Sequence, residues 1–133
     1  MKEEKQDLEE KLMRESLKQT GITQDEIDAV DNAITSCREM INYYLDNIPP
    51  VGNIRKQMLD LSLECDRVTL DKVAFDLDIS EASTIIKTNV LLKQDKKFDG
   101  NKLRKQLDKI KKQSSELVQK LSASLEEVAE KGY

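Results

Sequence analysis

The chain of 133 residues contains no histidine and no tryptophan, and it has only two prolines and four glycines. Without histidine it lacks the commonest general base, proton shuttle and metal ligand of proteins. A Ser-His-Asp triad is excluded for the same reason. Its many paired carboxylates fall on solvent-facing helical positions, where they serve as a hydrated surface. The sequence therefore predicts a protein that is not an enzyme, and it indicates no cofactor.

Cysteines and long apolar runs are equally scarce. Cys37 and Cys65 are too few and too far apart for a zinc cluster, so no metal site is expected. Each falls on an apolar helical stripe, which predicts two small buried side chains. No apolar run exceeds three residues, which argues against a membrane span, and Met1 is followed by charged residues rather than a signal peptide. We expect a cytoplasmic protein.

What remains is typical of helices. Charged residues make up 36% of the chain and aromatic residues 4%, and a chain with so few turn-forming residues can make only a few turns. We predict an all-α fold: an up-and-down antiparallel bundle of four to five helices with a long C-terminal, coiled-coil-like helix. Residues 1–20 form an acidic helix or arm, and residues 21–133 form the bundle as a single domain.

The stretch from Ile22 to Pro50 has the clearest boundaries. Thr23 can cap a helix and Glu26, three residues later, can complete a capping box. Pro49 and Pro50 end the helix, because proline lacks an amide hydrogen and its ring clashes with the preceding turn. Apolar residues recur between these ends at spacings of three and four. They are Ile27, Val30, Ile34, Cys37, Ile41, Tyr44 and Ile48.

The next stretch, residues 54–79, is either one helix or two. Its apolar residues alternate at spacings of four and three from Ile54 to Ile79, interrupted only by Lys72. Val68 and Thr69 are poor helix-interior residues, so we expect a bend or break at Asp66–Thr69. We expect a further helix to start at the capping signature of Asp78–Glu81 and to run to Lys93. Like Lys72, the polar residues Asn89 and Ser114 interrupt apolar stripes and are of a kind that fixes register.

From Lys102 to Lys131 the chain has heptad spacing and forms the longest predicted helix, after a loop in which Asn101 can cap. We expect this helix to extend beyond its shorter neighbours, so that a partner must cover its far end. The simplest partner is a second copy of the chain, which makes the protein a self-associating adaptor or assembly subunit. The predicted contact residues are Leu103, Leu107, Ile110, Leu117, Leu121 and Leu125.

Charge is unevenly distributed along the chain, whose net charge is −4. Residues 87–112 carry ten basic and three acidic residues. Such a segment attracts acidic surfaces of the same chain, of another copy or of a protein partner, and also phosphate backbones and anionic membrane surfaces. The acidic N-terminal helix is the complement that we favour. The possible contacts are Lys93, Lys96, Lys97, Lys102, Arg104, Lys105, Lys109, Lys111 and Lys112.

An alternative function is that of a nucleic-acid-associated regulator, which would use residues 69–90 as a helix-turn-helix-like corner and the basic segment 87–112 for phosphate contacts. Residues 69–90 have some features of a helix-turn-helix, with Ala74 in the first helix and Ser80 as the cap of the second. Two features argue against DNA reading. Asp78 replaces the usual turn glycine, and the second helix offers no Arg, Gln or Asn at its start to contact bases.

Overall fold

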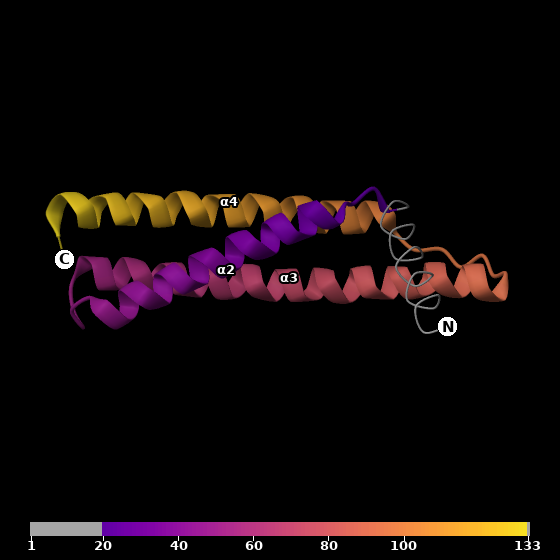
Figure 1. The fold of residues 1–133 in the computed structure, drawn as a ribbon, viewed down its shortest axis with the longest axis horizontal. Coiled ribbons are helices and arrows are strands. Elements are labelled where there is room, and N and C mark those ends of the chain that lie inside the picture. The colour runs from indigo at the N-terminus through magenta and orange to yellow at the C-terminus, as the bar shows by residue number, and fades with distance from the viewer. Residues whose placement is uncertain (1–19, 133) are drawn as a thin grey trace, which may run out of the picture.

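The computed structural model describes residues 20–132, and every regular element in that range is an α-helix (Figure 1). The helices are α2 (Gln24–Asn47), α3 (Asn53–Leu92) and α4 (Gly100–Lys131). The all-α class is confirmed, whereas the predicted count of four to five helices is not matched by these three. The predicted acidic helix or arm, residues 1–20, lies outside the described residues apart from Thr20.

The three helices run up and down along the long axis of the molecule. α3 and α4 lie side by side and antiparallel, and α2 crosses them obliquely while packing on both (Figure 1). α3 has 40 residues and α4 has 32, which correspond to lengths of about 60 Å and about 48 Å. The last turns of α3 therefore project past the first turn of α4.

The boundaries of α2 agree with the sequence prediction. The Thr23 hydroxyl accepts a hydrogen bond from the Glu26 amide at 3.2 Å, as an N-cap should. The reciprocal half of the capping box does not form, because the Glu26 carboxylate is held by Arg104 of α4 instead. The helix ends at Asn47, with Ile48 as its C-cap, immediately before Pro49 and Pro50.

The prediction of a break in α3 (Asn53–Leu92) was wrong, both at Asp66–Thr69 and at Asp78–Glu81. The polar residues that suggested caps have other roles: the Thr69 hydroxyl donates to the Cys65 carbonyl at 2.7 Å, and Asp78 accepts from Gln106 at 2.8 Å. Packing favours continuity, because the stripe that faces the core stays in phase through the half-buried Ile79 to the buried Ala82 and Ile86. Burial of one continuous stripe outweighs local capping preferences of about 1 kcal/mol each.

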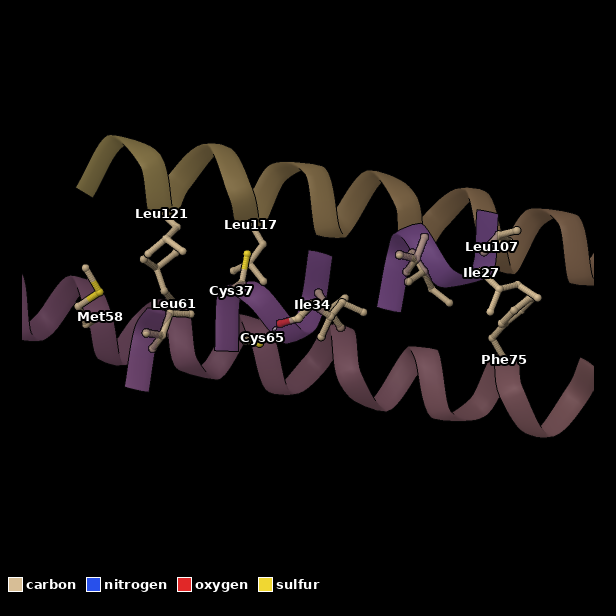
Figure 2. Packing of buried hydrophobic residues seen from close by; sticks show 14 of the residues in the cluster. Ile27, Ile34, Cys37, Met58, Leu61, Cys65, Phe75, Leu107, Leu117 and Leu121 are labelled. Atoms are coloured by element: carbon tan, nitrogen blue, oxygen red, sulfur yellow. Dashed lines mark hydrogen bonds between the residues drawn. The ribbon is translucent and has the colours of Figure 1, made fainter. Parts of the chain in front are cut away.

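The core is the seam where all three helices meet. Phe75 is fully buried and points from α3 toward Leu107 of α4 and Ile27 of α2 (Figure 2). Cys37 and Cys65 are buried, free thiols in the same cluster, as predicted. Burial raises the pKa of both thiols, because a thiolate is poorly solvated there.

The three polar residues that interrupt the apolar stripes form hydrogen bonds or ion pairs with residues close to them in the chain. Lys72 has a buried stem, and its ammonium group lies 2.7 Å and 2.9 Å from the two carboxylate oxygens of Asp76, one turn further along α3. The buried Ser114 hydroxyl donates to the Lys111 carbonyl at 3.0 Å. Asn89 ties back the loop after α3 by bonding both the amide and the carbonyl of Lys96.

α4 is covered by α2 and α3 as far as Val128, contrary to the expectation that a partner must cover its far end. Asp99, rather than the predicted Asn101, caps its start by accepting from the Lys102 amide, and Gly132 is its C-cap. At the far end, Ser124 donates to Gln57 of α3 at 2.7 Å. The reason is that the first turns of α3 lie along this end of α4, where the Asn53 side-chain amide donates to the Glu127 carboxylate at 3.5 Å.

Candidate interaction surface

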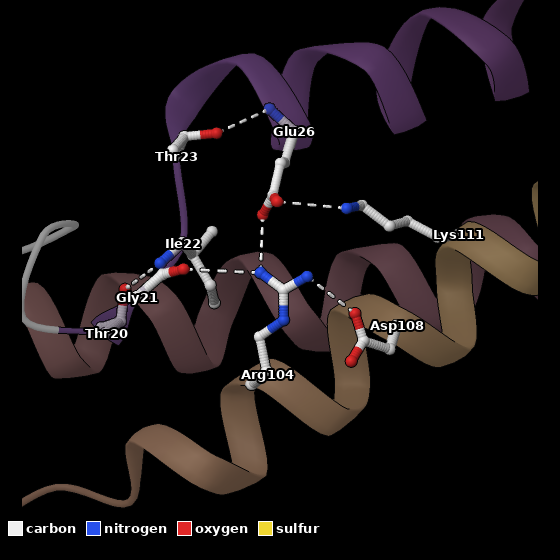
Figure 3. Close-up of polar contacts among 8 residues, drawn as sticks. All are labelled: Thr20, Gly21, Ile22, Thr23, Glu26, Arg104, Asp108 and Lys111. Atoms are coloured by element: carbon white, nitrogen blue, oxygen red, sulfur yellow. Dashed lines mark hydrogen bonds and ion pairs between the residues drawn. The ribbon is translucent and has the colours of Figure 1, made fainter.

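A network of charged side chains joins the start of α2 to α4 (Figure 3). The Arg104 guanidinium lies 2.8 Å from the Glu26 carboxylate and 2.9 Å from Asp108, and Lys111 lies 3.2 Å from Glu26. Arg104 also donates to the Gly21 carbonyl at 3.4 Å. The hydrogen bond from Arg104 is the main reason that the pKa of Glu26 lies below its ordinary value, and Lys111 adds to the effect. These ion pairs hold the start of α2 against α4.

Four of the nine basic side chains singled out in the sequence form ion pairs within the bundle. Besides Arg104 and Lys111, Lys102 pairs with Asp78 at 3.9 Å and Lys109 with Asp71 at 3.7 Å. The acidic partners therefore come from α2, α3 and α4, whereas the favoured complement, the N-terminal helix, lies outside the described residues. Lys93, Lys96, Lys97, Lys105 and Lys112 are exposed. Among residues 20–132, none of these five forms an ion pair.

The six side chains predicted to contact a partner lie in or against the core of the same chain. Leu103, Leu107, Ile110, Leu117 and Leu121 are buried, and Leu125 is half-buried against the core cluster. α2 and α3 cover them, so their apolar character is explained without a second molecule. A surface for a partner must be sought elsewhere.

The helix-turn-helix-like corner considered at residues 69–90 for the alternative function is not present. All of these residues lie within α3, so the structure has no turn between a positioning helix and a recognition helix at this place. Ala74 and Ser80 are exposed on the same continuous helix. The basic segment is the only predicted feature of the alternative function that the structure leaves in place.

The most unusual surface of the described residues is an apolar stripe on α3, which we call the outer face. Its side chains are 47–68% exposed, whereas the opposite side of the same helix is the core. No helix among residues 20–132 packs over it. The outer face consists of Leu59, Leu63, Leu70, Val73 and Leu77.

The outer face follows from the spacing of the residues. Leu63, Leu70 and Leu77 are seven residues apart, and each stands midway between two residues of the core stripe, for example Leu70 between Val68 and Lys72. Two residues of α-helix turn through about 200°, which places each leucine on the side opposite the core. α3 thus carries two heptad-like stripes. The 4-3 spacing from Leu59 to Leu77 is visible in the sequence and could have identified the second one.

A single charge interrupts the outer face. Asp66 occupies the stripe position between Leu63 and Leu70, and the guanidinium of Arg38 on α2 pairs with its carboxylate. The same guanidinium donates to the Ser62 hydroxyl at 3.1 Å. This contact holds Asp66 toward α2 while leaving its side chain 59% exposed. The outer face therefore consists of an apolar stripe with one negative charge near its middle.

The described residues offer no metal site or membrane span, and their other exposed apolar cluster is short. No group of residues among 20–132 has the composition to hold a metal ion. Within that range, too, no helix is sufficiently long and apolar to cross a bilayer. Val90, Leu91 and Leu92 are exposed where α3 projects past α4, but they lie at its end and do not continue the five-residue stripe.

Comparison with known proteins adds no assignment to this geometry. The chain matches no protein-family model, no curated protein and no solved structure.

Proposed function

We propose that this protein is a non-enzymatic assembly or adaptor subunit that binds an α-helix of a partner protein on the outer face of α3. The observation that carries the proposal is the position of five large apolar side chains at helical spacing, all 47–68% exposed, opposite the buried stripe of the same helix. Scattered surface leucines are ordinary, whereas a contiguous stripe of this kind marks a contact surface.

The chemistry of the stripe suggests the type of partner. From Leu59 to Leu77 the helix is uninterrupted and rises about 27 Å, or five turns. An amphipathic helix that presents its own apolar residues at spacings of three and four fits such a surface. The residues beside the stripe include Asp60, Arg67 and Asp76, so the edges carry both signs of charge.

The packing of the bundle limits the movement of α3 and therefore of the outer face. α2 and α4 both pack on the inner side of α3, and ion pairs such as Lys120 with Glu64 at 2.8 Å tie its flank to α4. A rigid helix loses little conformational entropy on binding, which favours association through a small area.

Photo-cross-linking in the cells that make the protein tests the proposal. We expect a photoreactive amino acid at position 70 to yield a discrete cross-linked protein. The matched control is position 118, because Val118 is also an exposed apolar residue but lies on α4. The proposal fails if positions 70 and 118 give the same adducts, or if position 70 gives none.

A further inference from the structure

The outer face is complementary to itself when two copies are arranged antiparallel. If the two α3 helices cross about a two-fold axis near residue 68, Leu59 lies opposite Leu77 of the second copy. In the same arrangement Leu63 lies opposite Val73, and Asp66 lies opposite Leu70. Every apolar residue of the stripe except Leu70 then meets another apolar residue, and all pairs fall into register together. From this match we infer that the partner of the outer face is a second copy of this chain, bound antiparallel through α3.

Asp66 selects between the two possible orientations. In a parallel pair, each residue faces its own equivalent, so the two Asp66 carboxylates would meet in the middle of the contact. Like charges placed opposite each other across an interface are unfavourable. In the antiparallel pair each carboxylate lies beside a leucine and keeps its ion pair with Arg38 of its own chain. The antiparallel arrangement is therefore preferred.

One contact in this arrangement is unfavourable. Arg67 flanks the stripe next to the axis, so the two Arg67 side chains approach each other. Arg67 is exposed, and its long side chain can direct the guanidinium into solvent. Screening by salt reduces the remaining repulsion between such exposed charges. The inner sides of both α3 helices stay packed on their own α2 and α4, so pairing requires no rearrangement of the bundle.

The inference rests on the proposed function, and the mass of the purified full chain tests it first. Light scattering over a concentration series should give a mass that rises from 15.3 kDa toward twice that value. A contact of five turns is small, so the dimer should dissociate on dilution. A mass of one chain at a concentration of about 1 mM overturns the inference and leaves residues 1–19 or a different protein as the occupant.

Substitution at Leu70 tests both the surface and the orientation. In the antiparallel pair residue 70 faces Asp66 of the second copy, so Leu70→Glu creates two repulsive pairs whereas Leu70→Lys creates two attractive ones. We expect Leu70→Glu to weaken dimerisation about ten-fold more than Leu70→Lys does. In a parallel pair residue 70 faces itself, and both variants should weaken it alike. Val118→Glu is the control and should leave the dimer unchanged. Equal effects of the two Leu70 variants, or no effect of either, overturn the inference.

Cross-linking reports the orientation without changing the apolar residues. Arg67 and Asp60 occupy equivalent positions one heptad apart and are both exposed. About an axis at residue 68, residue 67 of the two copies is offset by about 3 Å along the helix, whereas residue 60 is offset by about 24 Å. A short bismaleimide should therefore link Arg67→Cys to itself and leave Asp60→Cys monomeric. Linking of both indicates a parallel pair and refutes the inference. The wild type is the blank, because its own cysteines are buried.

The two proposals fail in different ways. If the purified chain is monomeric but position 70 captures another protein in cells, self-pairing is refuted and the helix-binding function stands. If position 70 captures nothing and the chain is monomeric, both are refuted. Circular dichroism of the Leu70 variants should match the wild type, because Leu70 is 68% exposed and its replacement leaves the core intact.

Discussion

Glu81 offers a sharp test of whether α3 is one helix. The sequence offers Asp78 or Ser80 as the cap of a new helix, and with either cap Glu81 would lie in its first turn, where proline is tolerated. In the structure Glu81 lies inside a continuous helix, where its amide donates to the carbonyl of Leu77. Glu81→Pro removes that hydrogen bond and drives the proline ring against the same carbonyl. The two readings therefore predict opposite results for one substitution.

The expected magnitude follows from the exposure of the site. Because the Glu81 side chain is exposed, its replacement removes no packing, and the cost is that of an interior proline, about 3 kcal/mol or more. A domain of this kind is stable by roughly 5–15 kcal/mol in total, so the loss is large. Urea unfolding followed by circular dichroism measures it, with Glu81→Ala as the control and an expected change within about 0.5 kcal/mol. A Glu81→Pro variant as stable as the wild type would refute the continuous helix.

Two further predictions concern the polar network and the thiols. The pKa of Glu26 is lower in the folded than in the unfolded chain, so its contribution is present above the unfolded pKa and is lost as the pH falls through the folded one. Glu26→Gln should therefore lower the free energy of unfolding at pH 7 by up to about 1 kcal/mol. The difference from the wild type should vanish in acid. A difference that does not change with pH would refute a stabilising ion pair between Glu26 and Arg104. Cys37 and Cys65 should react with a thiol reagent far more slowly in buffer than in urea, because both are buried with raised pKa values. Equal rates in a colorimetric thiol assay would contradict their placement in the core.

Local signals at helix ends explain which parts of the fold could be predicted. The boundaries of α2 could be predicted because Thr23 and the two prolines act within one turn of the ends they define. α3 misled the prediction because Thr69, Asp78 and Ser80 are good caps locally, whereas continuity depends on long-range burial of Ala82 and Ile86. Sequence patterns report local preference directly and tertiary packing only indirectly.

The candidate surface was missed for a related reason. A heptad stripe such as Leu103 to Leu125 has the same spacing whether neighbours in the bundle or a second molecule cover it, and only the packing of α2 and α3 along α4 decides between them. The two stripes of α3 occupy opposite sides, so the contrast between an apolar and a polar side, which usually marks a surface helix, is weak. The residues of the outer face were available in the sequence, but their exposure depends on where α2 and α4 pack.

Oxidative footprinting of the native protein tests the central claim most directly. Hydroxyl radicals modify exposed aliphatic side chains, so the chain can be compared when dilute and isolated and when purified intact from the cells that make it. We expect Leu63, Leu70 and Leu77 to be readily oxidised in the isolated chain and protected in the native preparation, while Val118 is oxidised equally in both. Equal oxidation of the three leucines in both preparations would contradict the claim that the outer face of α3 is a binding surface.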